Sequence, residues 1–365
     1  MILDEALLDD PARLQAGESG ELLRVAAGGG AQVRSTAEAA AERSLAETLA
    51  GLRPRAFVLL TRPGVGSRAA GVLRALLGPR CPVPVVLTDS APPWVGSLDV
   101  LYAHSSDPGD NVLAESIDMA TRRGAHVVLS AAPEGPVAAA AAGRAVLLSP
   151  RVTVPPTLMM PTALTAALLV SGALDLLRTD LWALADELDR EAERNHPMHE
   201  SFVSPAKALA LRVAGRAPLL LGLDAVATAV GKHAAASIGA HSGLLAVATG
   251  YREALAQPAL HRAAVLASAP ADIFRDPYAD EALLIDQPLR VMLLTVRGDD
   301  SAGVSRQAAT GALAAADVVA PADEVNGDEP LLAALLASRF DLAALYLGLA
   351  SGTLGGPGLT APVIA

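Results

Sequence analysis

The chain has 365 residues, of which 52% are hydrophobic and 3% aromatic, and its formal net charge is -11. This length allows two domains of ordinary size, each with its own core. The negative charge opposes binding to a nucleic-acid backbone or an anionic membrane, and so few aromatic residues offer no stacking platform for single-stranded nucleic acid. We therefore expect neither nucleic acid nor a membrane as a partner.

The cysteine content and the apolar segments indicate a cytoplasmic protein. Cys81 is the only cysteine, which excludes a disulfide framework and a thiolate metal cluster. The first residues are acidic and lack the apolar core of a signal peptide. Residues 162–177 come closest to the length of a membrane span, but their small residues and the missing positive flank favour a buried helix.

Residues 55–77 are the clearest structural unit of the first half. A short apolar run at 56–60 is typical of a strand buried on both faces, and a helical pattern follows it. Between the two, Gly64 and Gly66 let the backbone turn tightly and leave the amides of the next helix open to an anion. With further strands at 82–88, 99–103, 125–130 and 144–148, the pattern predicts a five-stranded parallel sheet covered on both faces. Residues 1–50 are expected to form one or two packing helices.

The second half repeats this plan. The proline-rich stretch 151–161 predicts a boundary between domains 1–155 and 156–365. A charged helix is expected over 180–194, and a second one over 204–213, where Ser and Pro give a typical helix start. Strands are predicted at 218–221, 244–249, 263–267 and 289–296, and residues 218–233 resemble the strand, turn and helix of 55–77. A long two-faced helix over 328–350 closes the chain.

Three segments resemble a known family. Residues 204–210 are similar to an Asn-Pro-Ala-Lys helix, residues 214–222 to the Gly-Arg-x-Pro run and strand that follow it, and residues 340–347 to a closing helix. The resemblance is to the sugar isomerase (SIS) fold and, within it, to the bifunctional phosphoglucose/phosphomannose isomerases, here a branch found in high-GC bacteria.

The resemblance implies two flavodoxin-like αβα SIS domains, each with a five-stranded parallel sheet, and a long C-terminal helix. It also implies a homodimer with sites between domains, and interconversion of aldose and ketose hexose 6-phosphates. That reaction needs an acid/base pair and neither a metal nor another cofactor.

The resemblance also points to a phosphate loop. The family's Ser/Thr-rich loop matches residues 104–111, where Ser105 and Ser106 are in place. Asp107 and Asp110 stand where neutral groups are expected, and two carboxylates repel a phosphate. An alternative role for both is to make a turn and to cap the next helix.

The Gly-rich turn at 61–67 is the other candidate for a ligand site. Arg62 supplies a positive charge and Ser67 a hydroxyl, next to Gly64 and Gly66. The turn differs from a dinucleotide fingerprint by Ala69 at the third glycine position. A nucleotide-cofactor enzyme therefore stays open as a third class of function.

The catalytic residues that the family implies are incomplete. Its base is the glutamate of an Asn-Glu pair, but the matching run at 237–242 contains no carboxylate. His261 is the nearest match to the ring-opening histidine, and Glu253 and His241 are substitute candidates for the base. Glu253 and His241 also have ordinary structural interpretations, and His261 lacks the flanking pattern of the family. Two hypotheses follow: an active isomerase with a rebuilt acid/base set, and an inactive sugar-phosphate sensor or partner subunit.

The segment 193–200 contains residue types that bind metals. Glu193, His196, His199 and Glu200 carry metal-compatible side chains, but Pro197 interrupts the helix that would place both imidazoles on one face. We interpret this segment as a polar connector, and no metal is predicted.

Overall fold

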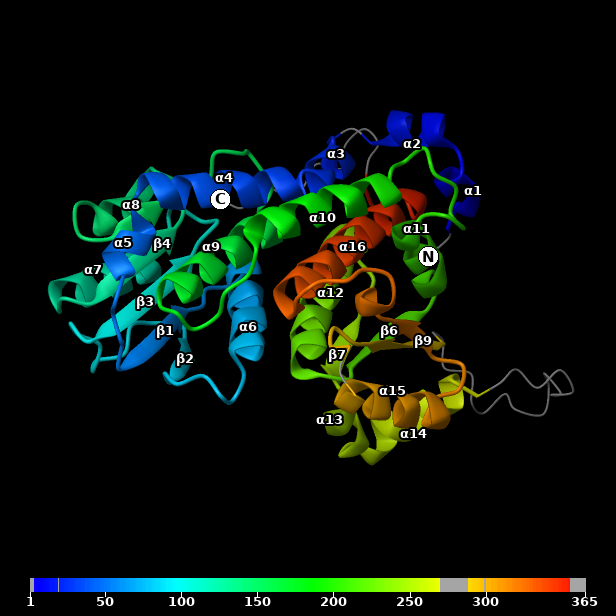
Figure 1. Cartoon of the computed structure of the whole chain (residues 1–365). Helices are drawn as coiled ribbons and strands as arrows, with labels where there is room; N and C mark the ends of the chain where they lie inside the picture. Colours follow the sequence, from blue (N-terminus) through cyan, green and yellow to red (C-terminus); the bar gives the residue numbers. More distant parts are fainter. Residues whose placement is uncertain (1–2, 19, 270–287, 299, 355–365) are drawn as a thin grey trace, which may run out of the picture. The chain divides into compact units, whose positions relative to one another are not determined.

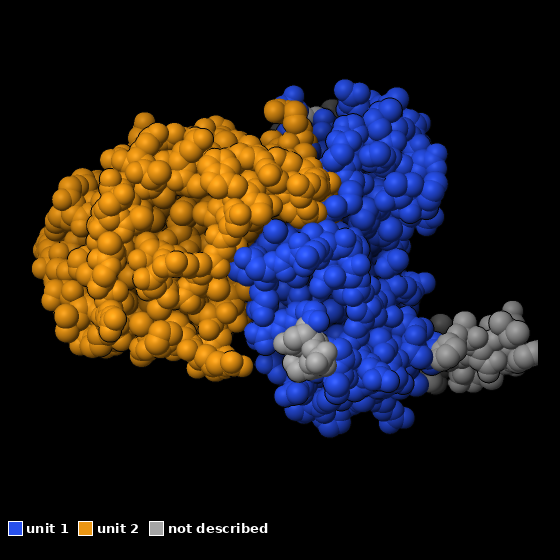
Figure 2. Space-filling model, viewed as in Figure 1, with its two compact units in different colours: residues 1–23, 193–365 blue, residues 24–192 orange. Residues whose placement is uncertain are grey.

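The computed structural model describes residues 3–18, 20–269, 288–298 and 300–354 (Figure 1). The chain forms two compact units, which Figure 2 colours separately: unit 2 comprises residues 24–192, and unit 1 comprises residues 1–23 and 193–365. Within the described residues, each unit contains one parallel sheet.

The sheet of unit 2 has the predicted five strands. They run parallel in the order β2-β1-β3-β4-β5. The strands are β1 (Ala56–Leu60), β2 (Val85–Thr88), β3 (Asp99–His104), β4 (His126–Ser130) and β5 (Val146–Leu148). All residues of β1 and β3 are buried, which explains the unbroken apolar run of β1. The strand order reverses between β1 and β3, and their carboxyl ends are the usual ligand edge of such a sheet.

Helices cover both faces of this sheet. Alternate strand residues such as Val58 and Leu101 share one core with α7 and α8, and on the other face the Tyr102 hydroxyl donates to the Ala163 carbonyl of α9 at 2.9 Å. The helices of this part of the chain are α3 (Leu22–Ala27), α4 (Gly29–Glu42), α5 (Leu45–Leu49), α6 (Val65–Leu77), α7 (Asn111–Arg122), α8 (Gly135–Ala141), η1 (Pro156–Leu158), α9 (Met160–Ala173) and α10 (Leu181–Arg194).

The compact units differ from the predicted ranges 1–155 and 156–365. Helix α9 lies beyond the proline-rich stretch, yet it packs on α4, α6 and β3 of unit 2. Arg34 of α4 likewise forms ion pairs with Asp186 and Asp189 of α10, at 2.6 and 2.7 Å. Apolar burial and these ion pairs therefore join α9 and α10 to the first sheet.

The N-terminal region contains more helices than predicted. Residues 1–50 form α1 (Glu5–Leu8) and α2 (Pro11–Gly17) as well as α3, α4 and α5. Helices α1, α2 and α5 are short because residues at their ends depart from helical geometry. Asp10 caps α2 by accepting from the Arg13 amide at 3.0 Å, and Ser44 has a φ of 48°, which ends helical geometry before α5.

The described sheet of unit 1 has four strands, one fewer than predicted. They are parallel in the order β7-β6-β8-β9. They are β6 (Ala217–Gly222), β7 (Val247–Gly250), β8 (Leu289–Leu294) and β9 (Asp317–Val319). The strand predicted at 263–267 is wrong, because these residues end α14 (Pro258–Ala267), which begins with proline at its first position. Five apolar residues are too few for periodicity to separate strand from helix.

Unit 1 also has helices on both sheet faces. Leu219, Leu221 and Leu293 share a core with Ala254 of α13 and Ala309 of α15. The remaining helices are α11 (Pro205–Val213), α12 (Ala225–Ser242), α13 (Tyr251–Leu255), α15 (Asp300–Ala312), η3 (Pro321–Asp323) and α16 (Glu329–Ala350).

Helix α16 is the predicted closing helix and a central element of unit 1. It packs on α12 and α11, and every residue from 330 to 350 is buried. A helix buried on all sides is apolar on all sides, which explains its composition. Among the described residues it is the one helix with the length and hydropathy of a membrane span, and its most apolar window is entirely buried.

Lys207 of α11 joins α1 to the loop that precedes α11. Its side chain is fully buried, and the Nζ donates to the carbonyls of Leu8, Pro197 and His199 at 2.6, 2.9 and 2.6 Å. The same ammonium lies 5.3 Å from the ring centroid of Tyr346 in α16. The helix itself starts as predicted, since the Lys207 amide donates to the Ser204 hydroxyl at 3.3 Å.

We expect Lys207→Met to lower the free energy of unfolding by about 3 kcal/mol, because methionine fills the space but leaves buried carbonyls without a donor. Urea unfolding followed by circular dichroism measures the change. The matched control is Lys232→Met, since Lys232 is exposed and is the other lysine of the chain. Equal effects of the two substitutions would contradict the role given to Lys207.

Candidate functional site

A cavity of about 250 Å³ lies at the carboxyl ends of β1 and β3 in unit 2. It is formed where the loop after β1 meets the loop after β3. We call it the β1/β3 pocket. Its lining residues are Arg62, Pro63, Gly66, His104, Ser105, Ser106, Asp107 and Asp110.

The pocket brings together four of the six ligand residues predicted from the sequence. Arg62, Gly66, Ser105 and Ser106 line it, whereas Gly64 and Ser67 do not belong to the lining. The Ser67 hydroxyl instead donates to the Gly64 carbonyl at 2.9 Å, inside the first turn of α6. Ser67 therefore stabilises the helix start, and its predicted role as a ligand stays a prediction.

The shape of the pocket depends on two glycines. Gly64 has a φ of 122°, which L side chains rarely adopt. At Gly66, a Cβ atom would lie 2.5 Å from the His104 carbonyl oxygen and 3.3 Å from the His104 ring. The first turn of α6 therefore approaches the end of β3 closely because residue 66 has no side chain.

Arg62 is held by an ion pair with Asp110. The Arg62 Nε lies 2.6 Å from Asp110 Oδ2, while Asp110 Oδ1 accepts from the Leu113 amide at 2.9 Å and caps α7. Burial alone would raise the pKa of Asp110, but the hydrogen bonds from Arg62 and Leu113 outweigh it and lower that pKa below its ordinary value. Asp110 is therefore charged at neutral pH, and its negative charge compensates the positive charge of Arg62.

Ser105 and Asp107 form a tight turn. The Ser105 hydroxyl donates to the Asp107 carbonyl at 2.8 Å and accepts from the Asp107 amide at 3.2 Å. The Asp107 carboxylate accepts from the Gly109 amide at 2.8 Å. Asp107 and Asp110 thus make the turn and the helix cap that the sequence offered as an alternative to phosphate binding.

His104 is a pocket residue that the sequence did not single out. It ends β3, its side chain is 4% exposed, and its Nδ1 lies 3.0 Å from the Ser130 hydroxyl of β4. Its Nε2 is buried and has no hydrogen-bond partner within the described part of the chain. Burial lowers the pKa of His104 to about 4, so the imidazole is neutral at pH 7. A polar residue at the end of a buried strand was the only sequence signal for it.

The corresponding turn of unit 1 is occupied by its own carboxylate. Asp224, after β6, accepts from the Ala227 amide at 2.7 Å, the Val296 amide at 2.9 Å and the Thr295 hydroxyl at 3.2 Å. These donors come from the first turn of α12 and from the loop after β8. These donors are therefore already paired with a carboxylate of the chain itself.

The three predicted catalytic residues lie on three helices of unit 1. His241 is on α12, Glu253 on α13 and His261 on α14. None of them lines the β1/β3 pocket, and in the described part of the chain no hydrogen bond or ion pair joins any two of them.

Glu253 has a capping role in the structure. Its Oε2 accepts from the Thr249 hydroxyl at 2.8 Å and from the Gly250 amide at 3.2 Å. The hydrogen bond from Thr249 contributes most to lowering its pKa below the ordinary value. The carboxylate is exposed and holds the start of α13.

The Nε2 of His261 is buried without a partner among the described residues.

His241 belongs to a buried polar cluster between α12 and α16. His233 Nε2 lies 2.9 Å from Asp341 Oδ1, and the Ser237 hydroxyl donates to the same oxygen at 2.6 Å. His241 follows on the same face of α12, and burial lowers its pKa. Within this cluster the Ser237 hydroxyl has a hydrogen-bond partner in Asp341, whereas the Nε2 of His241 is buried without one among the described residues.

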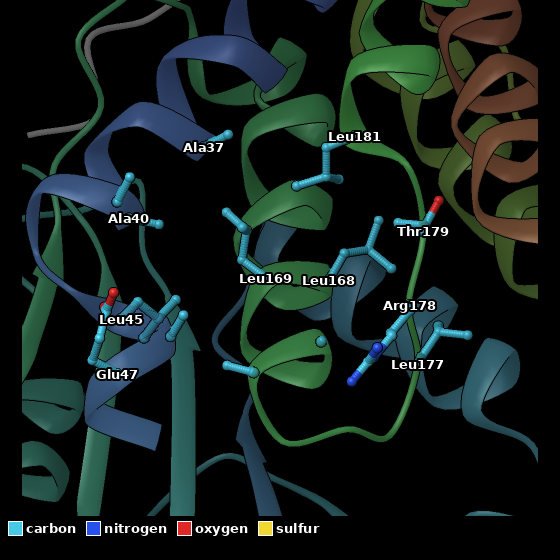
Figure 3. A pocket seen from close by; sticks show the side chains of 14 residues that line it. Ala37, Ala40, Leu45, Glu47, Leu168, Leu169, Leu177, Arg178, Thr179 and Leu181 are labelled. Atoms are coloured by element: carbon cyan, nitrogen blue, oxygen red, sulfur yellow. The ribbon is translucent and has the colours of Figure 1, made fainter. Parts of the chain in front are cut away.

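A larger cavity in unit 2 has a different chemistry. It measures about 500 Å³ and lies among α4, α5, α9 and the start of α10, as Figure 3 shows. Its wall consists mainly of alanine and leucine, for example Ala40, Leu168 and Leu169, and Arg178 beside it is paired with Asp175. The smaller β1/β3 pocket has more convergent polar groups and is the better candidate for a specific site.

Several solved structures align with this protein over almost the whole chain. The C-terminal domain of glucosamine-fructose-6-phosphate aminotransferase from Francisella tularensis aligns with a TM-score of 0.63 at 11% identity, over 93% of this chain and 99% of that one. Tagatose-6-phosphate ketose/aldose isomerase from Escherichia coli aligns with a TM-score of 0.59 at 13% identity, over 92% and 93%. A hypothetical protein from Thermus thermophilus aligns with a TM-score of 0.63 at 18% identity, over 97% and 92%.

The fold is therefore that of SIS-domain proteins, with two parallel sheets and a closing C-terminal helix, as the sequence predicted. No protein-family model matches the chain. No curated protein matches it significantly in sequence. At these identities the likeness establishes the fold alone.

The buried His104 predicts acid sensitivity. Its folded pKa of about 4 lies below the ordinary value of 6.5, so the unfolded chain binds a proton that the folded protein does not. The free energy of unfolding is not reduced by His104 above the ordinary pKa of 6.5, and it declines as the pH falls toward 4. At about pH 5 the loss is about 2 kcal/mol.

Urea unfolding at neutral and acidic pH measures this loss, and His104→Asn should flatten the pH dependence. His196→Asn, at an exposed imidazole, is the control. An equal pH dependence of the wild type and the His104 variant would contradict the assignment.

The two glycines of α6 give a matched pair of substitutions. Gly66→Ala should destabilise the protein by about 2 kcal/mol, because its Cβ meets the His104 backbone. Gly71→Ala, with nothing within 4 Å of its Cβ, should stabilise the same helix by roughly 0.5–1 kcal/mol. Thermal unfolding of both variants checks the opposite signs, and a neutral Gly66 variant would show that the close approach is not required.

Proposed function

We propose that the protein binds a carbohydrate derivative in the β1/β3 pocket, with sugar phosphates as the first candidates. The observation that carries this proposal is the pocket itself, where Arg62, Ser105 and Ser106 meet at the point of strand-order reversal. Open α/β sheets bind ligands at that edge, and a few convergent polar groups orient them. The names of structural neighbours, which include a tagatose-6-phosphate ketose/aldose isomerase, support a sugar phosphate as the first ligand to test.

We infer binding without turnover as the main function. Aldose–ketose isomerisation requires a base that moves a proton between C1 and C2 and an acid that opens the ring. Within the pocket, Asp110 is paired with Arg62 and the Asp107 carboxylate is held by the Gly109 amide. Outside it, Glu253 caps α13, which leaves no carboxylate assigned to the base. A sensor or partner subunit fits these contacts better than an isomerase.

The isomerase remains the alternative proposal, with glucose or mannose 6-phosphate as substrate and His261, Glu253 and His241 as the acid/base set. A homodimer in the cytoplasm is part of both proposals, and a second copy then supplies further groups to the site. The relation to the bifunctional phosphoglucose/phosphomannose isomerases rests on the sequence segments at 204–222 and 340–347.

Binding is tested by isothermal titration with glucose, mannose and their 6-phosphates. We expect at least one of them to bind saturably, and Arg62→Ala to weaken its binding about tenfold or more, because Arg62 is the cation of the pocket. Arg122→Ala, at an exposed arginine of α7 outside the lining, is the control. Binding that is unchanged in the Arg62 variant would move the ligand to another site.

Turnover is tested separately by coupled detection of fructose 6-phosphate from glucose 6-phosphate and mannose 6-phosphate. We expect no rate above background with the purified full chain. A clear rate that disappears in His261→Ala would replace the binding proposal with the isomerase.

A further inference from the structure

The charges around the β1/β3 pocket do not favour a phosphate. Of the lining residues, Arg62 carries the one positive charge, and Asp107 and Asp110 carry two negative charges. His104 adds none at neutral pH, because its imidazole is buried and neutral. The side chains that line the pocket therefore sum to one negative charge, in the place where an anion would have to bind.

The guanidinium of Arg62 already forms an ion pair with Asp110. Its Nε lies 2.6 Å from Asp110 Oδ2, and the side chain of Arg62 is 23% exposed, so solvent screens the pair only partly. A phosphate that approached Arg62 would meet the Asp110 carboxylate at the same time. To bind Arg62 fully, it would have to displace a carboxylate that also caps α7 through the Leu113 amide.

The other polar groups suit hydroxyl groups. The carboxylates of Asp107 and Asp110 accept hydrogen bonds, and a hydrogen bond from a sugar hydroxyl to a carboxylate is short and strong. Arg62 has further N–H groups that donate to a sugar oxygen. The imidazole of His104, 4% exposed and neutral, adds no charge to the pocket wall.

We propose that the β1/β3 pocket binds the uncharged, hydroxyl-bearing part of a carbohydrate and discriminates against a phosphate dianion, with Asp110 and Asp107 as the discriminating residues. The inference rests on the proposed function and narrows its ligand class. Asp110 has the larger effect, because it is partly buried whereas Asp107 is exposed. A ligand that carries a phosphate places it outside this pocket.

Two isosteric substitutions test the proposal. Asp107→Asn and Asp110→Asn remove the charges, yet asparagine still accepts from the Gly109 and Leu113 amides, so the turn and the helix cap are retained. The double variant is compared with the wild type and with Asp118→Asn. Asp118 lies on α7 outside the lining and pairs with Arg122 and Arg144. Circular dichroism and thermal unfolding confirm that each variant is folded.

Inorganic phosphate is the first probe, because it does not depend on the identity of the sugar. We expect no saturable phosphate binding to the wild type or to the Asp118 variant by titration calorimetry. The Asp107/Asp110 double variant should bind phosphate saturably, at least about tenfold more tightly than the weakest binding that the titration detects, a difference of about 1.4 kcal/mol, and Arg62→Ala added to it should abolish this binding. Equal phosphate binding by wild type and double variant overturns the proposal, and so does an absence of binding by both.

Hexoses and their 6-phosphates are the second probe. In the wild type, a neutral hexose should bind at least as tightly as its 6-phosphate, and the double variant should reverse this preference. Preferential binding of the 6-phosphate by the wild type, lost in Arg62→Ala, overturns the inference but supports the proposed function. Binding of no sugar at all, together with the expected phosphate gain in the double variant, contradicts the proposed function and supports the charge discrimination.

Discussion

The close contact between the first turn of α6 and the end of β3 is the constraint on which the candidate site depends. Gly66 allows it, because any side chain there would meet the His104 carbonyl. The contact sets the loop after β1 against the loop after β3, and so brings Arg62 within 2.6 Å of Asp110. The buried imidazole of His104 lies beside the same contact, with Nδ1 near the Ser130 hydroxyl and with no partner for Nε2 among the residues that the structure describes.

The two units differ in the polar contacts at the turn between a strand and the helix that follows it. Each has a strand, a tight turn and a helix whose first amides are available to an anion. In unit 1, Asp224 occupies these donors from within the chain. In unit 2, the acidic group is Asp110 on the neighbouring loop, where it pairs with Arg62 and leaves a cavity of about 250 Å³. Among the described residues, the turn of unit 2 therefore borders a cavity, whereas the donors at the turn of unit 1 are paired with Asp224.

Polar groups inside this protein mainly hold helices in place. The Nζ of Lys207 donates to three backbone carbonyls. Asp341 of α16 accepts from the Ser237 hydroxyl and lies beside His233 of α12. With few aromatic side chains to fill the core, alanine and leucine provide the packing and these buried polar contacts fix how the helices are oriented. His241 lies near one such cluster, where burial lowers its pKa, and its predicted catalytic role stays a prediction.

The sequence by itself determined most of the first sheet, the start of α11 and the position of the closing helix, because buried strands, helix caps and a long apolar helix leave local patterns; that α16 is buried on all sides and not two-faced came from the structure. It missed β9 and took residues 263–267 for a strand, since runs of three to five residues carry no reliable period. Only the tertiary structure decided that Arg62 pairs with Asp110 and that His104 joins the pocket. Those residues are far apart or ordinary in the sequence, and parallel strands bring their ends to one edge only after the sheet has formed.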